Sequence, residues 1–306
     1  MADRPRPGEA PPLPPGRHIE LPGRGTTFVR EVAGPPDAPT LLLLHGWTAG
    51  SDLTWFACFE ELGRHFRVIS MDHRGHGRGM RTRTRFSLED CADDVAALVD
   101  VLGLGSSGNG PLLAVGYSLG GCVAQLLWRR HRALAGGLVL CSTSAVFADS
   151  PVERRYFAGL GALALASRAT PATLRRRLAH RIIGRRVGDS ACQEWILEEL
   201  RRSDPTAVLE AGRALGSFDS RSWVGGLDIP VSVVVTTSDR QVLPARQLSL
   251  AEAVAGSTVH EVAAGHDACV SAPRRFVPAL MEACQSVVTR ATAGASACSG
   301  PAGPSR

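Results

Sequence analysis

The chain of 306 residues predicts an α/β protein with a mostly parallel, doubly wound sheet and an inserted helical cap. Three observations lead to this fold class. Apolar runs typical of buried strands alternate with helix-like stretches between residues 40 and 141. The alternation stops between residues 142 and 227, where only helical patterns are found, and it resumes at residue 231. Short stretches rich in Gly, His and Asp follow the strands directly, at the edge where such sheets bind ligands.

Composition shifts set the expected domain boundaries. Residues 1–16 are rich in proline and read as a disordered leader, and residues 291–306 read as a flexible, low-complexity tail. The core is expected to comprise residues 17–141 and 228–290. Residues 142–227 then form the helical cap insertion, which should lie over the carboxyl ends of the strands.

The expected strands are short and mostly apolar. A strand pair at the N-terminus, with a Pro-Gly turn, precedes runs that read as strands buried on both faces. The expected helices include one that Ser87 caps, with Asp90 close to the capping-box position. The strands are expected at His18–Leu21, Thr26–Val32, Thr40–Leu44, Arg67–Met71, Leu112–Val115, Gly137–Cys141, Val231–Thr236 and Thr258–Val262. The helices are expected at Trp55–His65, Cys91–Leu102, Cys122–Arg130, Val152–Ser167, Pro171–Ile183, Ala191–Arg202, Asp204–Leu215, Ala245–Val254 and Pro273–Val288.

Charge, cysteine pattern and hydropathy exclude several classes of protein. The net charge is +5, but all 34 basic residues are arginines spread along the chain and aromatic residues are few, which argues against nucleic-acid binding. The eight cysteines form no Cys-x-x-Cys pair, so neither a disulfide framework nor a zinc site is expected, and reduced thiols fit the cytoplasm. No apolar run approaches the roughly 20 residues that cross a bilayer, so no integral membrane association is expected.

A Gly-x-Ser-x-Gly motif lies at the centre of the chain. The apolar strand Leu112–Val115 leads into Gly116-Tyr117-Ser118-Leu119-Gly120-Gly121, and a helical run follows at once. This strand–turn–helix context is that of a nucleophile elbow. Glycines flank the serine because side chains there would collide in so tight a turn, and the helix start directs free N–H groups toward the Ser118 oxygen.

A serine nucleophile needs a base and an acid that orients the base, in the chain order Ser, Asp or Glu, His. His266 follows an expected strand and precedes a helix, whereas His260 lies inside a strand, His180 in the insertion and His131 on the elbow helix. Asp239 follows the strand Val231–Thr236 and is the preferred acid. Asp149 is the second candidate for the acid. Asp219 and Asp228 are less favoured because they precede that strand, and Asp267 is less favoured because it adjoins His266 in the chain.

The oxyanion donors are expected to be backbone N–H groups of Leu119, after the serine, and Trp47, in the loop after the Thr40–Leu44 strand. His45, Trp55 and Tyr117 are candidates for the substrate pocket. For His45, a structural role in which it hydrogen-bonds the loop is favoured over direct chemistry.

The chain resembles serine hydrolases of the α/β-hydrolase fold, esterase- or lipase-like, with a helical cap. The matching pieces are His45-Gly46-Trp47, the loop Asp72–Gly77, Gly116–Gly121, Ser238-Asp239 and Gly265-His266. The loop Asp72–Gly77 resembles the family's Asp-x-Arg-Gly-x-Gly turn. This resemblance argues against a metal site formed by the histidines of the loop. Because a serine occupies the nucleophile position, the resemblance to haloalkane dehalogenases and soluble epoxide hydrolases fails.

The resemblance implies hydrolysis of carboxylic esters with a small to medium apolar acyl group, through an acyl-enzyme and without metal or organic cofactor. A small-molecule acyl substrate is the expected partner; oligomeric state stays open. The alternatives are a thioesterase or acyltransferase, a cofactor-free haloperoxidase-like enzyme, a carbon–carbon bond hydrolase and, less favoured, a non-catalytic binding protein on this fold.

The cap carries one basic helix. Arg175–Arg177, Arg181, Arg185 and Arg186 lie opposite Leu174, Leu178 and Ile182. A site for an anionic acyl carrier, coenzyme A or lipid headgroups is one interpretation. A solvated cap face is the other, and it is favoured on general grounds.

Overall fold

The computed structural model describes residues 10–104, 111–183 and 193–298, and these form a three-layer α/β domain with a helical cap. Its eight-stranded sheet has the order β1-β2-β4-β3-β5-β6-β7-β8. The strands β1 and β2 form an antiparallel hairpin, β2 pairs antiparallel with β4, and the six strands from β4 to β8 run parallel. The strands are β1 (Gly16–Leu21), β2 (Gly25–Val32), β3 (Thr40–Leu44), β4 (Arg67–Met71), β5 (Leu112–Tyr117), β6 (Gly137–Cys141), β7 (Val231–Thr236) and β8 (Thr258–Val262).

The helices divide into two layers and a cap. The layers contain α1 (Ser51–Trp55), α2 (Phe59–Gly63), α3 (Leu88–Val101), α4 (Leu119–Arg130), α9 (Pro244–Ala253), α10 (Ala268–Ser271) and α11 (Pro273–Cys298), with a 3-10 turn at Val224–Gly226. The cap contains α5 (Pro151–Ala169), α6 (Ala172–Ile183), α7 (Gln193–Arg202) and α8 (Pro205–Ser217).

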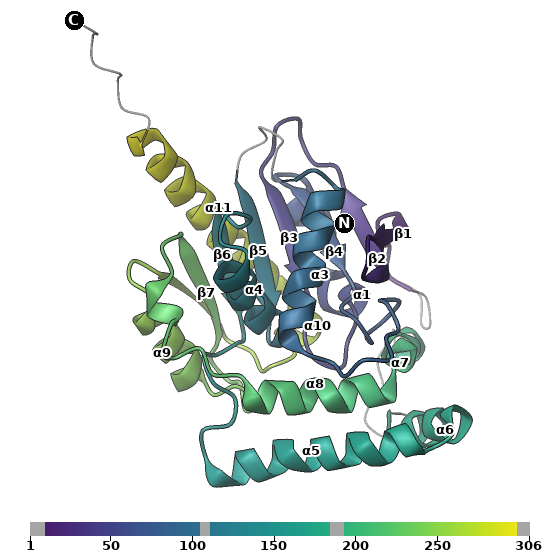
Figure 1. The fold of residues 1–306 in the computed structure, drawn as a ribbon. Helices are drawn as coiled ribbons and strands as arrows, with labels where there is room; N and C mark the ends of the chain where they lie inside the picture. Colours follow the sequence, from purple (N-terminus) through teal and green to yellow (C-terminus); the bar gives the residue numbers. More distant parts are fainter. Residues whose placement is uncertain (1–9, 105–110, 184–192, 299–306) are drawn as a thin grey trace, which may run out of the picture.

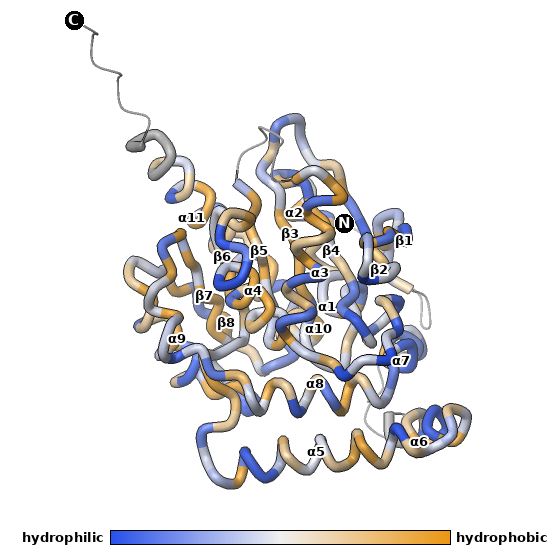
Figure 2. The backbone as a smooth tube through the Cα atoms, in the orientation of Figure 1, coloured by the Kyte–Doolittle hydropathy of each residue, from blue (hydrophilic) through white to orange (hydrophobic). Residues whose placement is uncertain are grey.

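The central strands are buried on both faces because each face has its own helical layer. Along β3, Leu42 and Leu44 pack into the core that contains α3, α4 and α9, while Leu41 and Leu43 pack into the core that contains α2 and α11. All five residues of β3 are buried. The apolar strands accordingly form the hydrophobic centre of the molecule (Figure 2). The predicted doubly wound sheet is thus confirmed.

The cap helices lie beyond the carboxyl ends of the parallel strands (Figure 1). Of these, α8 is next to the sheet and α5 packs on its outer side (Figure 1). Ser150 caps α5 in a reciprocal capping box with Glu153, and the Asp204 side chain caps α8 by accepting from the N–H groups of Thr206 and Ala207. These caps fix the first residues of α5 and α8, the two longest helices of the cap.

Three boundaries differ from the expectations. The predicted helix Trp55–His65 is wrong: α1 ends at Trp55 and α2 begins at Phe59, because the segment between them turns. At the C-terminus α11 continues through residues 291–298, where the composition predicted a flexible tail. At the N-terminus Leu13, inside the expected leader, packs against the α11 side of the core. Residues 1–9 and 299–306 lie outside the described residues.

Within the described part of the chain, no helix is both long and apolar enough to span a membrane. Six cysteines of this part are buried free thiols. Burial raises the pKa of Cys122 and Cys284 above the ordinary thiol value, which disfavours their reactive thiolate form. These thiols therefore serve as core side chains.

Candidate active site

Ser118 sits on a strained turn between β5 and α4. Its backbone angles, φ 51° and ψ −111°, fall in a region that non-glycine residues rarely adopt. The strain is held because a Cβ at Gly116 would lie 2.3 Å from the Gly120 carbonyl oxygen, and a Cβ at Gly120 would lie 2.1 Å from that of Leu44. Only glycine allows these approaches, so the elbow predicted from the motif is confirmed in its backbone.

The structure brings Ser118, His266 and Asp239 together from three separate loops. The His266 Nε2 atom lies 3.0 Å from the Ser118 hydroxyl, and its Nδ1 atom lies 2.7 Å from an Asp239 carboxylate oxygen. The serine is 5% exposed and the aspartate 3% exposed, whereas the histidine side chain is 16% exposed. The three side chains form a hydrogen-bonded chain that is open to solvent at its histidine. Such a chain can move a proton from serine to histidine.

Asp239 is held as a carboxylate by several donors. One oxygen accepts from the backbone N–H groups of Gln241 and Val242, and the other accepts from the Thr236 hydroxyl and the Gln247 amide as well as His266. Burial disfavours the charged form, but the bonds from His266 and the two N–H groups outweigh it and hold the pKa of Asp239 below its ordinary value. The carboxylate can therefore orient His266 and stabilise its protonated form.

The rival acids and histidines lie in other environments. Asp149 and Asp219 both pair with Arg221 at the surface, and Asp228 accepts from the Trp128 indole. His131 pairs with Asp93 at 2.8 Å, and His260 lies 3.7 Å from Glu282. Of the described candidates, only His266 contacts Ser118, and only Asp239 contacts the other ring nitrogen of His266. His180 lies on α6, and nothing is described of its side chain.

Two backbone N–H groups near the serine are free. Neither Leu119, the first residue of α4, nor Trp47 donates its backbone N–H to any described residue. The Trp47 indole, by contrast, donates to the Val208 carbonyl of α8 at 2.7 Å, and a Cβ at Gly212 of the same helix would lie 2.5 Å from the ring. The loop that carries the Trp47 N–H is thus tied directly to the cap.

Two residues predicted to line the substrate pocket are core residues instead. His45 is 0% exposed; its Nδ1 atom lies 2.8 Å from the Gly46 carbonyl and its Nε2 accepts from the His73 N–H at 2.9 Å. Burial holds the pKa of His45 below its ordinary value, so the ring is neutral and fixes the loop. Trp55 is also 0% exposed and packs against Tyr117 and Phe276. A completely buried ring cannot contact substrate.

Tyr117, the third predicted pocket residue, is 3% exposed and has a different role. Its hydroxyl donates to the His266 backbone carbonyl at 2.6 Å. This bond ties the strand that carries the serine to the loop that carries the histidine. Sequence reasoning also missed Gln247, whose amide holds both Asp239 and the Thr236 hydroxyl. No local motif signals that glutamine, because it reaches the site from the middle of α9.

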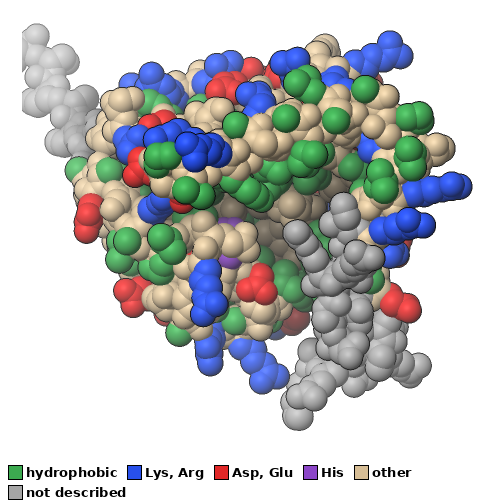
Figure 3. Space-filling view, turned by 90° about the horizontal axis from the view of Figure 1, so that it is seen from below, with side chains coloured by type: hydrophobic (Ala, Val, Ile, Leu, Met, Phe, Trp, Pro, Cys, Tyr) green, Lys and Arg blue, Asp and Glu red, His purple; other side chains and the backbone are tan. Residues whose placement is uncertain are grey.

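The face of the molecule seen from below is hollowed. Figure 3 shows hydrophobic side chains gathered around this hollow, and a histidine side chain is visible inside it. The cap helices leave large apolar side chains exposed. They include Val152, Tyr156, Leu163 and Leu165 of α5 and Leu174 and Leu178 of α6.

The parallel sheet, the strained serine at the carboxyl end of β5 and the covering helices define an α/β-hydrolase enzyme. The chain belongs to the alpha/beta hydrolase fold family, whose model matches residues 39–273. The family resemblance and fold expected from the motifs are thereby confirmed.

Proteins similar to this chain include esterases. The chain is 31% identical over 226 residues to a pimeloyl-[acyl-carrier protein] methyl ester esterase of Neisseria meningitidis, covering 69% of this chain and 79% of that protein. It is 26% identical over 233 residues to the AB hydrolase superfamily protein YisY of Bacillus subtilis, covering 74% and 82%. A thermophilic esterase from Thermogutta terrifontis superposes with a TM-score of 0.71 and 26% identity, covering 89% of this chain and 99% of that one.

Proposed function

We propose that the protein hydrolyses carboxylic esters of a small to medium apolar acyl group, with Ser118 as nucleophile, His266 as general base and acid, and Asp239 as the orienting acid. The observation that carries the proposal is the continuous chain of hydrogen bonds from the Ser118 hydroxyl through His266 to Asp239. The named esterases among the similar proteins support the same reaction class.

The proposed reaction begins with proton transfer. The Asp239 carboxylate accepts from the Nδ1–H of His266, which leaves Nε2 free to take the proton of the Ser118 hydroxyl. The serine oxygen attacks the ester carbonyl, and the resulting oxyanion is bound by the N–H groups of Leu119 and Trp47. The protonated His266 then gives its proton to the leaving alcohol, and an acyl-enzyme remains. Water, activated by the same histidine, releases the acid and regenerates the serine.

The proposed acyl preference comes from the cap. The hollow in Figure 3 is bordered by hydrophobic side chains, and a hydrophobic wall favours an apolar acyl chain over a charged one. The residues between 142 and 227 thus choose the substrate, while the core supplies the chemistry.

A fluorophosphonate probe and p-nitrophenyl esters test this proposal. The wild-type protein should be labelled and should turn over the esters, and Ser118→Ala should abolish both. Ser217→Ala, which removes an exposed serine of the cap, is the matched control and should change neither. Labelling that persists in Ser118→Ala would contradict the nucleophile assignment.

A substrate series identifies the bond and the acyl length. Short and long acyl esters are compared with acyl thioesters, and an added alcohol tests for acyl transfer. Faster turnover of thioesters, or transfer in place of hydrolysis, would replace esterase with thioesterase or acyltransferase on the same residues. A haloperoxidase-like enzyme or a carbon–carbon bond hydrolase would turn over the substrates of that activity and would not turn over the esters.

A further inference from the structure

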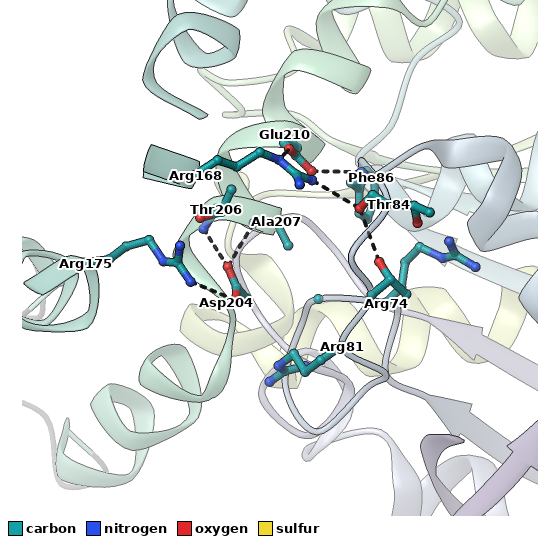
Figure 4. Close-up of a pocket in the computed structure, with 12 residues that line it drawn as sticks. Arg74, Arg81, Thr84, Phe86, Arg168, Arg175, Asp204, Thr206, Ala207 and Glu210 are labelled. Atoms are coloured by element: carbon teal, nitrogen blue, oxygen red, sulfur yellow. Dashed lines mark hydrogen bonds and ion pairs between the residues drawn. The ribbon is translucent and has the colours of Figure 1, made fainter. Parts of the chain in front are cut away.

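A second cavity lies where the cap meets the core, and its lining includes none of the residues proposed for ester hydrolysis. Its volume is about 230 Å³. It lies between the core loop that contains residues 74–86 and the cap helices α5, α6 and α8 (Figure 4). Its cationic side chains are Arg74, Arg81, Arg168 and Arg175, and hydroxyls come from Thr82, Thr84 and Thr206. Four arginines around one small cavity indicate a site for an anion.

Two of these arginines are neutralised by carboxylates within the protein. Arg74 makes a two-pronged contact with Asp94, with both N–O distances 2.8 Å. Arg168 donates to Glu210 at 2.6 Å, and the other oxygen of Glu210 accepts from the Phe86 N–H. These pairs build the walls of the cavity and leave little net charge to attract a ligand.

The other two arginines have no hydrogen-bonded carboxylate partner, although Arg175 forms a long ion pair with Asp204 and donates to the Ser167 carbonyl at 3.2 Å. Arg81 donates only to the backbone carbonyls of Gly77, Gly79 and Arg202, and no described carboxylate lies within ion-pair distance of it. Arg175 lies 3.8 Å from the Asp204 carboxylate, which is beyond hydrogen-bond distance.

The Arg175 Nε–H is shielded from solvent and has no described hydrogen-bond partner. A buried donor without a partner costs about 1–3 kcal/mol, more when it is charged. Figure 4 shows the side chains of Arg81 and Arg175 reaching the cavity from the core loop and from α6 respectively. The two guanidinium groups that lack a hydrogen-bonded carboxylate therefore face one cavity from opposite sides (Figure 4).

We propose that this cavity binds a small free oxyanion, a phosphate or carboxylate group with a body of few atoms, between Arg81 and Arg175. The volume corresponds to roughly seven or eight water molecules at about 30 Å³ each, which is enough for such an anion. The two guanidinium groups supply planar donors suited to an oxyanion, and the threonine hydroxyls supply neutral ones.

Binding at this position links the cap to the core, because Arg81 belongs to the core loop and Arg175 to α6. A bound anion therefore stabilises the closed arrangement of the two parts. The site is independent of the proposed ester hydrolysis, so the two proposals fail separately.

Calorimetric titration with inorganic phosphate and, separately, with succinate tests the site at constant ionic strength. Arg81→Gln and Arg175→Gln should each weaken binding at least tenfold. Arg85→Gln and Arg213→Gln are the matched controls, because both residues line a neighbouring depression between α5 and α8 instead. These controls should keep the wild-type affinity.

Preference for phosphate or for succinate would support the site and name its ligand class. Equal binding by the wild type and by both Arg81→Gln and Arg175→Gln would overturn the proposal, as would no binding of either anion at millimolar concentration. Arg81→Lys keeps the charge and guards against a folding artefact: it should retain part of the affinity that Arg81→Gln loses. Circular dichroism and ester turnover check that each variant is folded.

Discussion

The sheet core and the helical cap of this enzyme are held together by different forces. In the core, every residue of β3, β5, β6 and β7 is buried, and the backbones approach so closely that only glycine fits at the elbow. In the cap, α5 has a single buried residue, Ala164, and exposes large apolar side chains. The core is fixed by close packing on all sides, whereas α5, the outer helix of the cap, packs on one side only.

The cap is joined to the core both by apolar packing of α8 and by polar contacts. Arg78 of the core pairs with Glu199 of α7 at 3.0 Å and with Asp52 at 2.8 Å. The N–H of Asp204, where α8 begins, donates to the Gly75 carbonyl at 2.8 Å. These polar contacts fix the orientation of the cap, in addition to the apolar packing of Ala211 and Leu215 in the core. Under the proposed function, the chemistry lies on the rigid core and substrate choice lies with the cap.

The largest expected effect comes from the core acid. Asp239→Asn keeps the shape but removes the charge that orients His266, so ester turnover should fall roughly 10⁴-fold. Asp149→Asn, at the surface, is the control and should change turnover little. Steady-state kinetics compares the two variants. If instead Asp149→Asn caused the loss, the acid would belong to the loop that leads into the cap.

Close packing at the elbow predicts the next largest effect, on stability. The added methyl of Gly120→Ala would meet the Leu44 carbonyl at 2.1 Å, and neither backbone can move without disturbing the sheet. The free energy of unfolding should fall by about 3 kcal/mol or more. Urea denaturation measures it. If Gly120→Ala unfolded at the same urea concentration as the wild type, the elbow would be less tightly packed than the strands around it.

Acid should destabilise the core through its buried histidines. Burial, reinforced by the neighbouring His45, holds the pKa of His76 at about 3, far below 6.5. The folded state thus excludes a proton that the unfolded chain binds. The contribution of His76 to the free energy of unfolding is therefore complete above about pH 6.5 and is lost as the pH falls toward 3. The loss approaches about 1.4 kcal/mol per pH unit.

The variant His76→Asn isolates this pH dependence. An asparagine amide can replace the Nδ1 donor that lies 3.1 Å from the Arg74 carbonyl, and it does not titrate. Chemical denaturation at pH 7 and pH 5 should therefore show a smaller stability loss for the variant than for the wild type. Equal losses would place the acid sensitivity elsewhere, for example in the cap's ion pairs.

Trp47 tests whether the two regions are coupled. Trp47→Phe removes the indole N–H that donates to Val208 of α8, while its backbone N–H stays in place. If the cap positions the proposed oxyanion donor, kcat should fall roughly tenfold with KM little changed. Trp223→Phe, which loses a ring stacked on Trp128, is the matched control. A change in KM alone would assign Trp47 to substrate binding.

The smallest expected effect is an increase in the stability of the cap. Gly159 lies inside α5, and a Cβ there would meet nothing within 4 Å. Gly159→Ala should therefore stabilise the helix by up to about 1 kcal/mol. Thermal unfolding would show a higher midpoint if cap and core unfold together. An unchanged midpoint would show that the cap unfolds separately, and a lower midpoint would contradict the open surface.

Much of the core was predictable because its signals are local. The strand at 40–44 is a continuous apolar run, and Ser87 caps α3 by accepting from the Asp90 N–H as its sequence position suggests. Ser118, Asp239 and His266 were each predictable from their place after a strand, since parallel strands end at the same edge of the sheet.

The errors arise where contacts are distant in sequence. Trp55 and Tyr117 lie near the motifs, so sequence position suggested a pocket, but burial and ring packing turn them inward. For His45, the favoured structural role was right, and only its place among the pocket candidates was wrong. The helix break at residues 56–58 likewise carries no glycine or proline. In these cases packing overrides the local pattern.

By itself, the sequence determined the doubly wound sheet, the elbow and the order of nucleophile, acid and histidine, because periodicity, turn glycines and strand ends are written in consecutive residues. Only the tertiary structure showed that His266 lies within hydrogen-bond distance of both Ser118 and Asp239. It also decided that Gln247 and Tyr117 support them, that Trp47 is tied to the cap, and that Arg81 and Arg175 face one cavity. These outcomes depend on where folding brings separate segments together, and no local pattern contains that information.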